Sequence, residues 1–330
     1  MARRIVILRC SLALAAVAAL VGLLIAGRQG SSPRTSMLKR LTNRDCRRCH
    51  AEVWHEWAGS QHAQAWSADV VQASFRHFGF DRKCESCHAP EPVLAAEMPA
   101  EPVLRAGGRQ SGVDCISCHA LADGGVAARR DLPNAPCRPR RVSLLEDSRA
   151  CGLCHVAIYQ DWQSTRFAAQ GQSCQTCHMR TETGQTSHTC TGSRDMALLR
   201  SGVRLRTRLQ QGGVHVAVTN HRTGHNYPGE RHHRVLLLEV MQYDASGALA
   251  AGEQVQIKGI TPFRGESSAE RIRSGETFHH TFALVPEAAQ ARVRLLYKLF
   301  PWLPDREATI VHQRVLRRAA GQVPPSEAAP

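Results

Sequence analysis

The hydrophobic pattern divides the chain into two parts with different periods. Between residues 42 and 195 the apolar positions fall into short amphipathic stretches, and 51–65 and 156–169 are predicted to be helical. Residues 89–113 and 120–148 are interrupted by Pro and Gly and are predicted to be loops. Because no sustained two-residue alternation occurs here, we expect a mostly helical and irregular domain over residues 42–200.

From about residue 202 the pattern takes the period of β-strands. Apolar and polar residues alternate over 203–209 and 214–218, and further strands are predicted at 235–243, 255–260, 276–285 and 292–300. Asp244-Ala-Ser-Gly247 marks a turn. Six or so strands in about 115 residues predict an antiparallel β-sandwich over 201–318, followed by a disordered tail at 319–330. The fold class expected for the whole chain is therefore α+β with several domains.

The first 28 residues have the pattern of an export segment. Arg3, Arg4 and Arg9 precede an apolar run over 10–27, and Arg28 closes it. This run is long for a cleaved signal peptide and about the minimum length for spanning a bilayer, so we favour an uncleaved anchor and keep a cleaved signal as the alternative. Charges before the run predict that the body lies outside, on the periplasmic side of a bacterial inner membrane. Residues 29–41 are predicted to be a linker.

Ten of the 13 cysteines belong to five copies of one motif, C-x-x-C-H. The copies are Cys46-Arg-Arg-Cys49-His50, Cys84-Glu-Ser-Cys87-His88, Cys115-Ile-Ser-Cys118-His119, Cys151-Gly-Leu-Cys154-His155 and Cys174-Gln-Thr-Cys177-His178. In c-type haem attachment, the two thiols bind the vinyl groups of one porphyrin and the histidine becomes the proximal iron ligand. The Cys and His frequencies of this chain predict roughly 0.03 copies by chance. We therefore predict five covalently bound c-type haems.

Other interpretations of the cysteines explain less. A disulfide framework does not require a histidine after every pair, and zinc ribbons leave those histidines unexplained. Redox C-x-x-C sites occur singly. Cys10, Cys137 and Cys190 lie outside the motifs. Cys137 and Cys190 could form a disulfide in an oxidising compartment or remain free thiols.

The formal charge of +14 first suggests a nucleic-acid partner. The basic residues are scattered, however, and no stacking platform accompanies them, so we expect no nucleic acid. Haem propionates would offset much of the positive charge. Aromatic residues make up only 5% of the chain, and porphyrins filling the interior would explain that low share.

An internal repeat relates the first and fourth motifs. A shift of 105 residues places Cys46, Cys49 and His50 on Cys151, Cys154 and His155, and the residues around Trp57 on those around Trp162. In this register His62 falls on Phe167. Either another histidine supplies the iron ligand that Phe167 cannot provide, or one haem iron has an open position. We favour the first.

The motifs resemble a family of multihaem cytochromes that includes the tetrahaem cytochrome of ammonia oxidisers and hydroxylamine oxidoreductase. The segments that carry the resemblance are Cys46 to His50 with Trp57-Ala-Gly-Ser60-Gln-His62-Ala, Gly112-Val-Asp-Cys115-Ile-Ser-Cys118-His119, Ser173-Cys174-Gln-Thr-Cys177-His178-Met179, Ser187-His188 with Gly192-Ser-Arg-Asp195, and Asn220 to Gly224-His225-Asn-Tyr-Pro228-Gly229. The last two are similar to members that append a sandwich to the cytochrome domain. The resemblance implies that His62, His188 and His225 are distal iron ligands. His77 is the next candidate, followed by His221, His232 and His233.

Three functions fit these residues. We favour an electron carrier between redox partner proteins, for example from a quinol-oxidising membrane oxidase or dehydrogenase to a periplasmic acceptor. The alternative is an oxidoreductase that acts on a small nitrogen or sulfur compound at an open haem iron, and the absence of a C-x-x-C-K motif argues against a nitrite reductase. A third interpretation is a scaffold in a larger redox complex, with the sandwich as its docking face.

Overall fold

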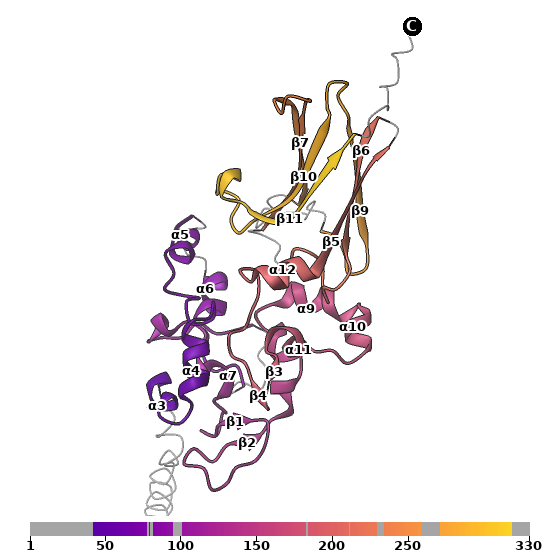
Figure 1. Ribbon diagram of the computed structural model, residues 1–330. Helices are drawn as coiled ribbons and strands as arrows, with labels where there is room; N and C mark the ends of the chain where they lie inside the picture. Colours follow the sequence, from indigo (N-terminus) through magenta and orange to yellow (C-terminus); the bar gives the residue numbers. More distant parts are fainter. Residues whose placement is uncertain are drawn as a thin grey trace, which may run out of the picture.

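The computed structural model describes residues 42–77, 79, 82–94, 101–182, 184–210, 212–229, 234–258 and 271–318. Figure 1 shows a part made of short helices and loops, followed along the chain by a part made of long strands. In the described ranges, no helix combines the length and the apolar character that crossing a membrane requires. The predicted export segment, linker and C-terminal tail lie outside the described residues.

The cytochrome module is built from short elements. Its helices are α3 Asn43–Arg47, α4 Ala51–Ala58, α5 Asp69–His77, α6 Arg82–His88, α7 Cys115–His119, α8 Arg149–Gly152, α9 Val156–Gln163, α10 Arg166–Ala169, α11 Cys174–His178 and α12 Met196–Gly202. Single turns and two-residue strands fill the predicted loops: η1 Arg109–Ser111, β1 Ala127–Ala128, β2 Arg140–Arg141 and η2 Ser143–Glu146, with β3 Thr181–Glu182 and β4 Gln185–Thr186 further on.

The two predicted helices are confirmed only in part. The helix expected at 51–65 ends at Ala58, and residues 59–67 form turns and a bend instead. The helix expected at 156–169 is divided at Ser164 into α9 and α10. The two regions are built alike, because His50 is the N-cap residue of α4 and His155 is the N-cap residue of α9. This shared geometry is the structural basis of the 105-residue repeat.

The predicted sandwich is present and has one strand more than expected at its C-terminal end. One sheet has the order β5-β6-β9, with β5 Val203–Gln210, β6 Gly213–Asn220 and β9 Thr277–Ala283. The other has the order β11-β10-β7-β8, with β7 Val235–Tyr243, β8 Leu249–Lys258, β10 Gln290–Lys298 and β11 Thr309–Arg317. The single turn η3 Asp305–Glu307 precedes β11. All pairings within these two sheets are antiparallel.

The sandwich holds the main apolar core of the described residues. Val218 and Phe282 from one sheet belong to the same buried cluster as Leu238 and Val293 from the other. In the described part of the cytochrome module, the buried apolar cluster is much smaller and contains Val93, Leu94 and Ala127. Side chains alone therefore give the module little to pack around, as expected if a large cofactor completes its interior.

Candidate haem-binding site

Each attachment motif lies on a helical turn. Positions i, i+3 and i+4 of a helix share one face, so the two cysteines and the histidine of C-x-x-C-H can serve one flat cofactor. Motifs two, three and five end α6, α7 and α11 at His88, His119 and His178. Motifs one and four instead end at the N-caps of α4 and α9.

Backbone carbonyls fix the tautomer of five histidines. Nδ1 of His88 lies 2.5 Å from the carbonyl oxygen of Ala65, and Nδ1 of His119 lies 2.8 Å from that of Ala127. The other such contacts of Nδ1 are His178 with Thr191 at 2.6 Å, His188 with Thr186 at 2.9 Å, and His225 with Asn226 at 2.8 Å. A carbonyl oxygen can only accept, so Nδ1 carries the proton in each ring. Nε2 is left as the nitrogen that can bind a metal.

Three proximal histidines each have a second imidazole at one characteristic distance. The ring centres of His62 and His155 are 6.2 Å apart, those of His119 and His188 are 6.2 Å apart, and those of His178 and His225 are 6.3 Å apart. An iron bound at ~2.0 Å by two imidazole nitrogens holds the ring centres about 6.3 Å apart. The gap in each pair therefore fits one haem iron with two axial histidines.

Four of these six histidines have lowered pKa values, which favours the neutral form that metals bind. Burial, together with the neighbouring His155 and His88, lowers the pKa of His62 to about 4. Burial likewise lowers the pKa of His225 to about 4. Burial also lowers the pKa values of His119 and His188.

The structure does not place every predicted distal ligand in such a pair. The ring of His77 lies 6.0 Å from that of Trp302 in the sandwich. The backbone N–H of His221 donates to the Gly202 carbonyl, and His221 lies beside Arg166 rather than near a proximal histidine. His232 and His233 lie outside the described residues. Among the described imidazoles none faces His50 or His88 at the paired distance, so their distal ligands stay a prediction.

Phe167 lies close to a histidine of the sandwich. A Cβ added to Gly224 would lie 3.5 Å from Cβ and Cγ of Phe167, so Gly224 lies beside the Phe167 side chain. His225 follows Gly224 and faces His178. A histidine from the sandwich therefore lies near the position at which the repeat has Phe167, and the replacement of the missing ligand by another histidine stays a prediction.

Cysteines of different motifs lie close together. Hydrogen bonding with Cys115 lowers the pKa of Cys46 to about 7. In the same way Cys154 lowers the pKa of Cys87 to about 7, and Cys151 lowers the pKa of Cys174 to about 6. Motif one therefore adjoins motif three, and motif four adjoins motifs two and five. Cys137 and Cys190 are both free, so the disulfide considered for them is absent.

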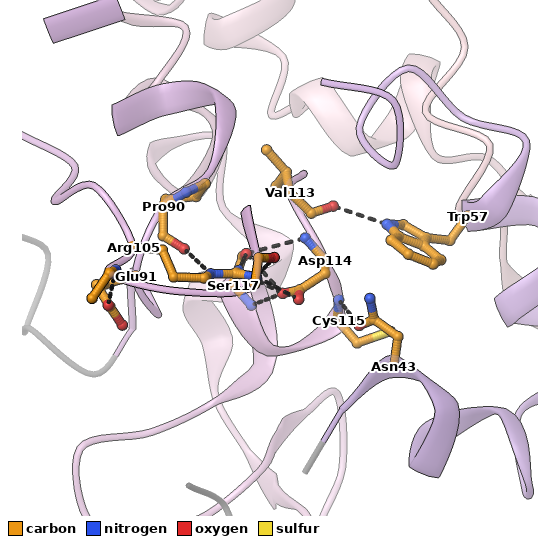
Figure 2. A network of polar contacts seen from close by, with 11 residues as sticks. Asn43, Trp57, Pro90, Glu91, Arg105, Val113, Asp114, Cys115 and Ser117 are labelled. Atoms are coloured by element: carbon orange, nitrogen blue, oxygen red, sulfur yellow. Dashed lines mark hydrogen bonds and ion pairs between the residues drawn. The ribbon is translucent and has the colours of Figure 1, made fainter. Parts of the chain in front are cut away.

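A polar network that the sequence did not reveal holds motif three (Figure 2). Asp114 is the N-cap of α7 and accepts the Ser117 backbone N–H at 2.8 Å. Arg105 pairs with both carboxylate oxygens of Asp114, at 2.8 and 2.9 Å, and donates to the Ser117 hydroxyl at 2.7 Å. Asn43 accepts the Cys115 backbone N–H at 3.2 Å, which ties α7 to α3.

The same segment also positions His62. Gly112 has φ +60°, and a Cβ there would lie 2.4 Å from the carbonyl oxygen of His62. The Val113 backbone N–H donates to that carbonyl at 2.9 Å. Only glycine permits this close approach at a positive φ. A single sequence does not show that the backbone needs this conformation here.

A buried ion pair joins the cytochrome module to the sandwich. Arg271 donates to both carboxylate oxygens of Asp161 on α9, at 2.6 and 3.2 Å, and to the carbonyl of Gly229 at 3.2 Å. Both side chains are about nine-tenths buried, with exposures of 8% and 12%. A Cβ on Gly229 would lie 2.8 Å from Cε1 of His225. The pair therefore lies beside the His225–His178 site, and no pattern along the chain connects two residues that are so far apart.

The repeated motifs and the paired histidines together define a multihaem c-type cytochrome. The family model described as cytochrome c554 and c-prime matches residues 45–120, which contain the first three motifs. This match supports the resemblance to multihaem c-type cytochromes over those residues.

One solved structure shares the fold over most of the chain. It is a penta-heme cytochrome c552 from Thermochromatium tepidum, with 19% sequence identity and a TM-score of 0.67, and the alignment covers 85% of this chain and all of that one. The structural genomics target SoR45 aligns over 38% of this chain and 92% of its own, with 13% identity and a TM-score of 0.22, too low to support an argument. No curated protein matches the sequence.

Proposed function

We propose that the protein carries electrons through five covalently bound c-type haems in an exported, periplasmic redox chain. The observation that carries this proposal is the three pairs of imidazoles, His62 with His155, His119 with His188, and His178 with His225, whose ring centres are 6.2–6.3 Å apart. Two axial histidines leave a haem iron no open position for a substrate, so these sites favour electron transfer over catalysis.

The chain supplies the axial ligands. His50, His88, His119, His155 and His178 would be proximal, and His62, His188 and His225 would be distal to the irons at His155, His119 and His178. When bound, haem iron supplies a one-electron ferric–ferrous couple. The Nδ1 contacts to carbonyls orient the imidazoles. Electron carriage requires no acid or base from the protein.

The similarity to a penta-heme cytochrome supports the count of five. Export agrees with covalent haem attachment and with the charge pattern of residues 1–28. We expect redox partner proteins on both sides of the transfer, among them a membrane quinol oxidase or dehydrogenase.

The test uses the full chain matured in a host with cytochrome c assembly machinery. Pyridine haemochrome and mass should give five haems, and His62→Ala, His188→Ala and His225→Ala should each convert about one haem in five to the high-spin form. His55→Ala is the matched control, since His55 is exposed on α4. Carbon monoxide should not bind the low-spin haems. A haem that binds carbon monoxide, together with turnover of hydroxylamine, nitrite or sulfite, would show that the protein is an enzyme and not a carrier.

A further inference from the structure

The outer surface of the sheet β5-β6-β9 is basic. Strand alternation buries Val203 and Leu205 and exposes Arg204, Arg206 and Arg208. Across the sheet these arginines are in register with Thr219 and Thr277, Ala217 and His279, and His215 and Thr281. We call these nine residues the basic face. None of them is acidic.

The arginines of this face have no carboxylate partner among the described residues, because none of the ion pairs there includes Arg204, Arg206 or Arg208. Alternate residues of a strand are about 6.7 Å apart, so three positive charges lie in a row and repel one another. The nearest carboxylate along the strands is Glu276, beside Thr277, and it lies 3.8 Å from Arg273. The face therefore offers unbalanced positive charge to a partner.

The positive surface continues toward the His178–His225 site. The charges of Arg204, Arg222 and Arg166 all lower the pKa of His221, after the larger effect of its burial, so these guanidinium groups lie near it. Arg166 donates to the His221 carbonyl at 3.0 Å. It precedes Phe167, which contacts Gly224 beside His225. Figure 1 shows α10, which begins at Arg166, below β5 and β9 on the same side of the molecule.

We propose that the basic face, extended by Arg222 and Arg166, docks an acidic electron-transfer protein that exchanges electrons at the His178–His225 site. The inference rests on the proposed carrier function. Guanidinium groups pair with carboxylates in two-pronged geometry, and complementary charge raises the rate of encounter. One electron would pass between a one-electron centre of the partner and the haem iron, with no bond formed or broken.

An anionic membrane would match the charge as well. The position of the face favours a protein, because the positive surface leads to a redox site and a docked protein can bring its own redox centre there. A lipid headgroup has no electron to exchange.

The test compares two triple variants of the holoprotein. R204Q/R206Q/R208Q removes three charges from the basic face, and R44Q/R130Q/R138Q removes three from exposed positions in α3 and between β1 and β2. Figure 1 shows these elements at the opposite end of the molecule from the sandwich. Stopped flow measures reduction by reduced flavodoxin, an acidic protein donor, and by hydroquinone, a neutral small donor. At low salt, the ratio of the flavodoxin rate to the hydroquinone rate should fall about tenfold in the first variant and less than twofold in the second.

Three outcomes would overturn the proposal: equal ratios in the two variants, a ratio that does not depend on salt, or binding to phosphatidylglycerol vesicles that is lost only in R204Q/R206Q/R208Q while the ratio stays unchanged. The last outcome would assign the face to a membrane. Failure of the carrier function is distinguishable, because hydroquinone would then reduce none of the proteins.

Discussion

Replacement of Gly229 by alanine tests whether His225 occupies an iron site. The new Cβ would lie 2.8 Å from Cε1 and 3.1 Å from Nδ1 of His225, and 3.5 Å from Cδ1 of Ile158. Ordinary contacts begin near 3.4 Å, so the imidazole must move by about 0.6 Å. Metal–ligand distances tolerate about 0.2 Å. We therefore expect the haem at His178 to lose its second axial ligand.

The expected result is conversion of about one haem in five to the high-spin form, seen by optical and electron paramagnetic resonance spectroscopy, with added imidazole restoring the low-spin form. Overpacking should also lower the free energy of unfolding by about 1–3 kcal/mol. Gly107→Ala is the control, because a Cβ there meets nothing within 4 Å. A Gly229→Ala protein with entirely low-spin haems and unchanged potentials would show that His225 does not ligate iron.

Two further predictions concern buried ion pairs. Asp161→Asn leaves the Arg271 guanidinium buried without its carboxylate and should lower the free energy of unfolding by about 3–5 kcal/mol, measured by denaturant titration. Most of that loss should disappear in Asp161→Asn/Arg271→Met, and an equal loss in the double variant would contradict the pairing. Asp114→Ala removes the cap of α7 and the partner of Arg105, so it should cost about 3 kcal/mol, whereas Asp123→Ala, in an exposed pair, should cost less than about 1 kcal/mol.

Strand alternation made much of the sandwich predictable. The strand expected at 235–243 matches β7 residue for residue, and its nearly continuous burial is typical of a strand that is covered on both faces. The last strand, β11, was missed. Its exposed positions include Ile310 and Val315, and a register shift opposite Leu295 and Leu296 breaks the two-residue period. Apolar residues on the exposed face remove the alternation of apolar and polar positions on which strand prediction depends.

The helical module was predictable in its chemistry and not in its geometry. Five motifs located the proximal histidines, but no spacing along the chain could show that His62 faces His155 of the fourth motif rather than His50 of its own. That pairing depends on turns after Gly59 that ended a predicted helix early. It also depends on Gly112, whose φ of +60° lets the motif-three loop reach His62.

The junction between the two parts explains why the sandwich belongs to the redox machinery. The repeat that relates motifs one and four supplies a histidine at His62 and a phenylalanine at Phe167. The Phe167 side chain lies beside Gly224, and the next residue, His225, faces His178 at the distance that one iron requires. The ion pair of Asp161 with Arg271 closes the same junction. Because this ligand comes from the sandwich, the stability of the junction and the ligation of that iron depend on each other. A partner that docks on the sandwich therefore binds a surface that is directly connected to the redox site.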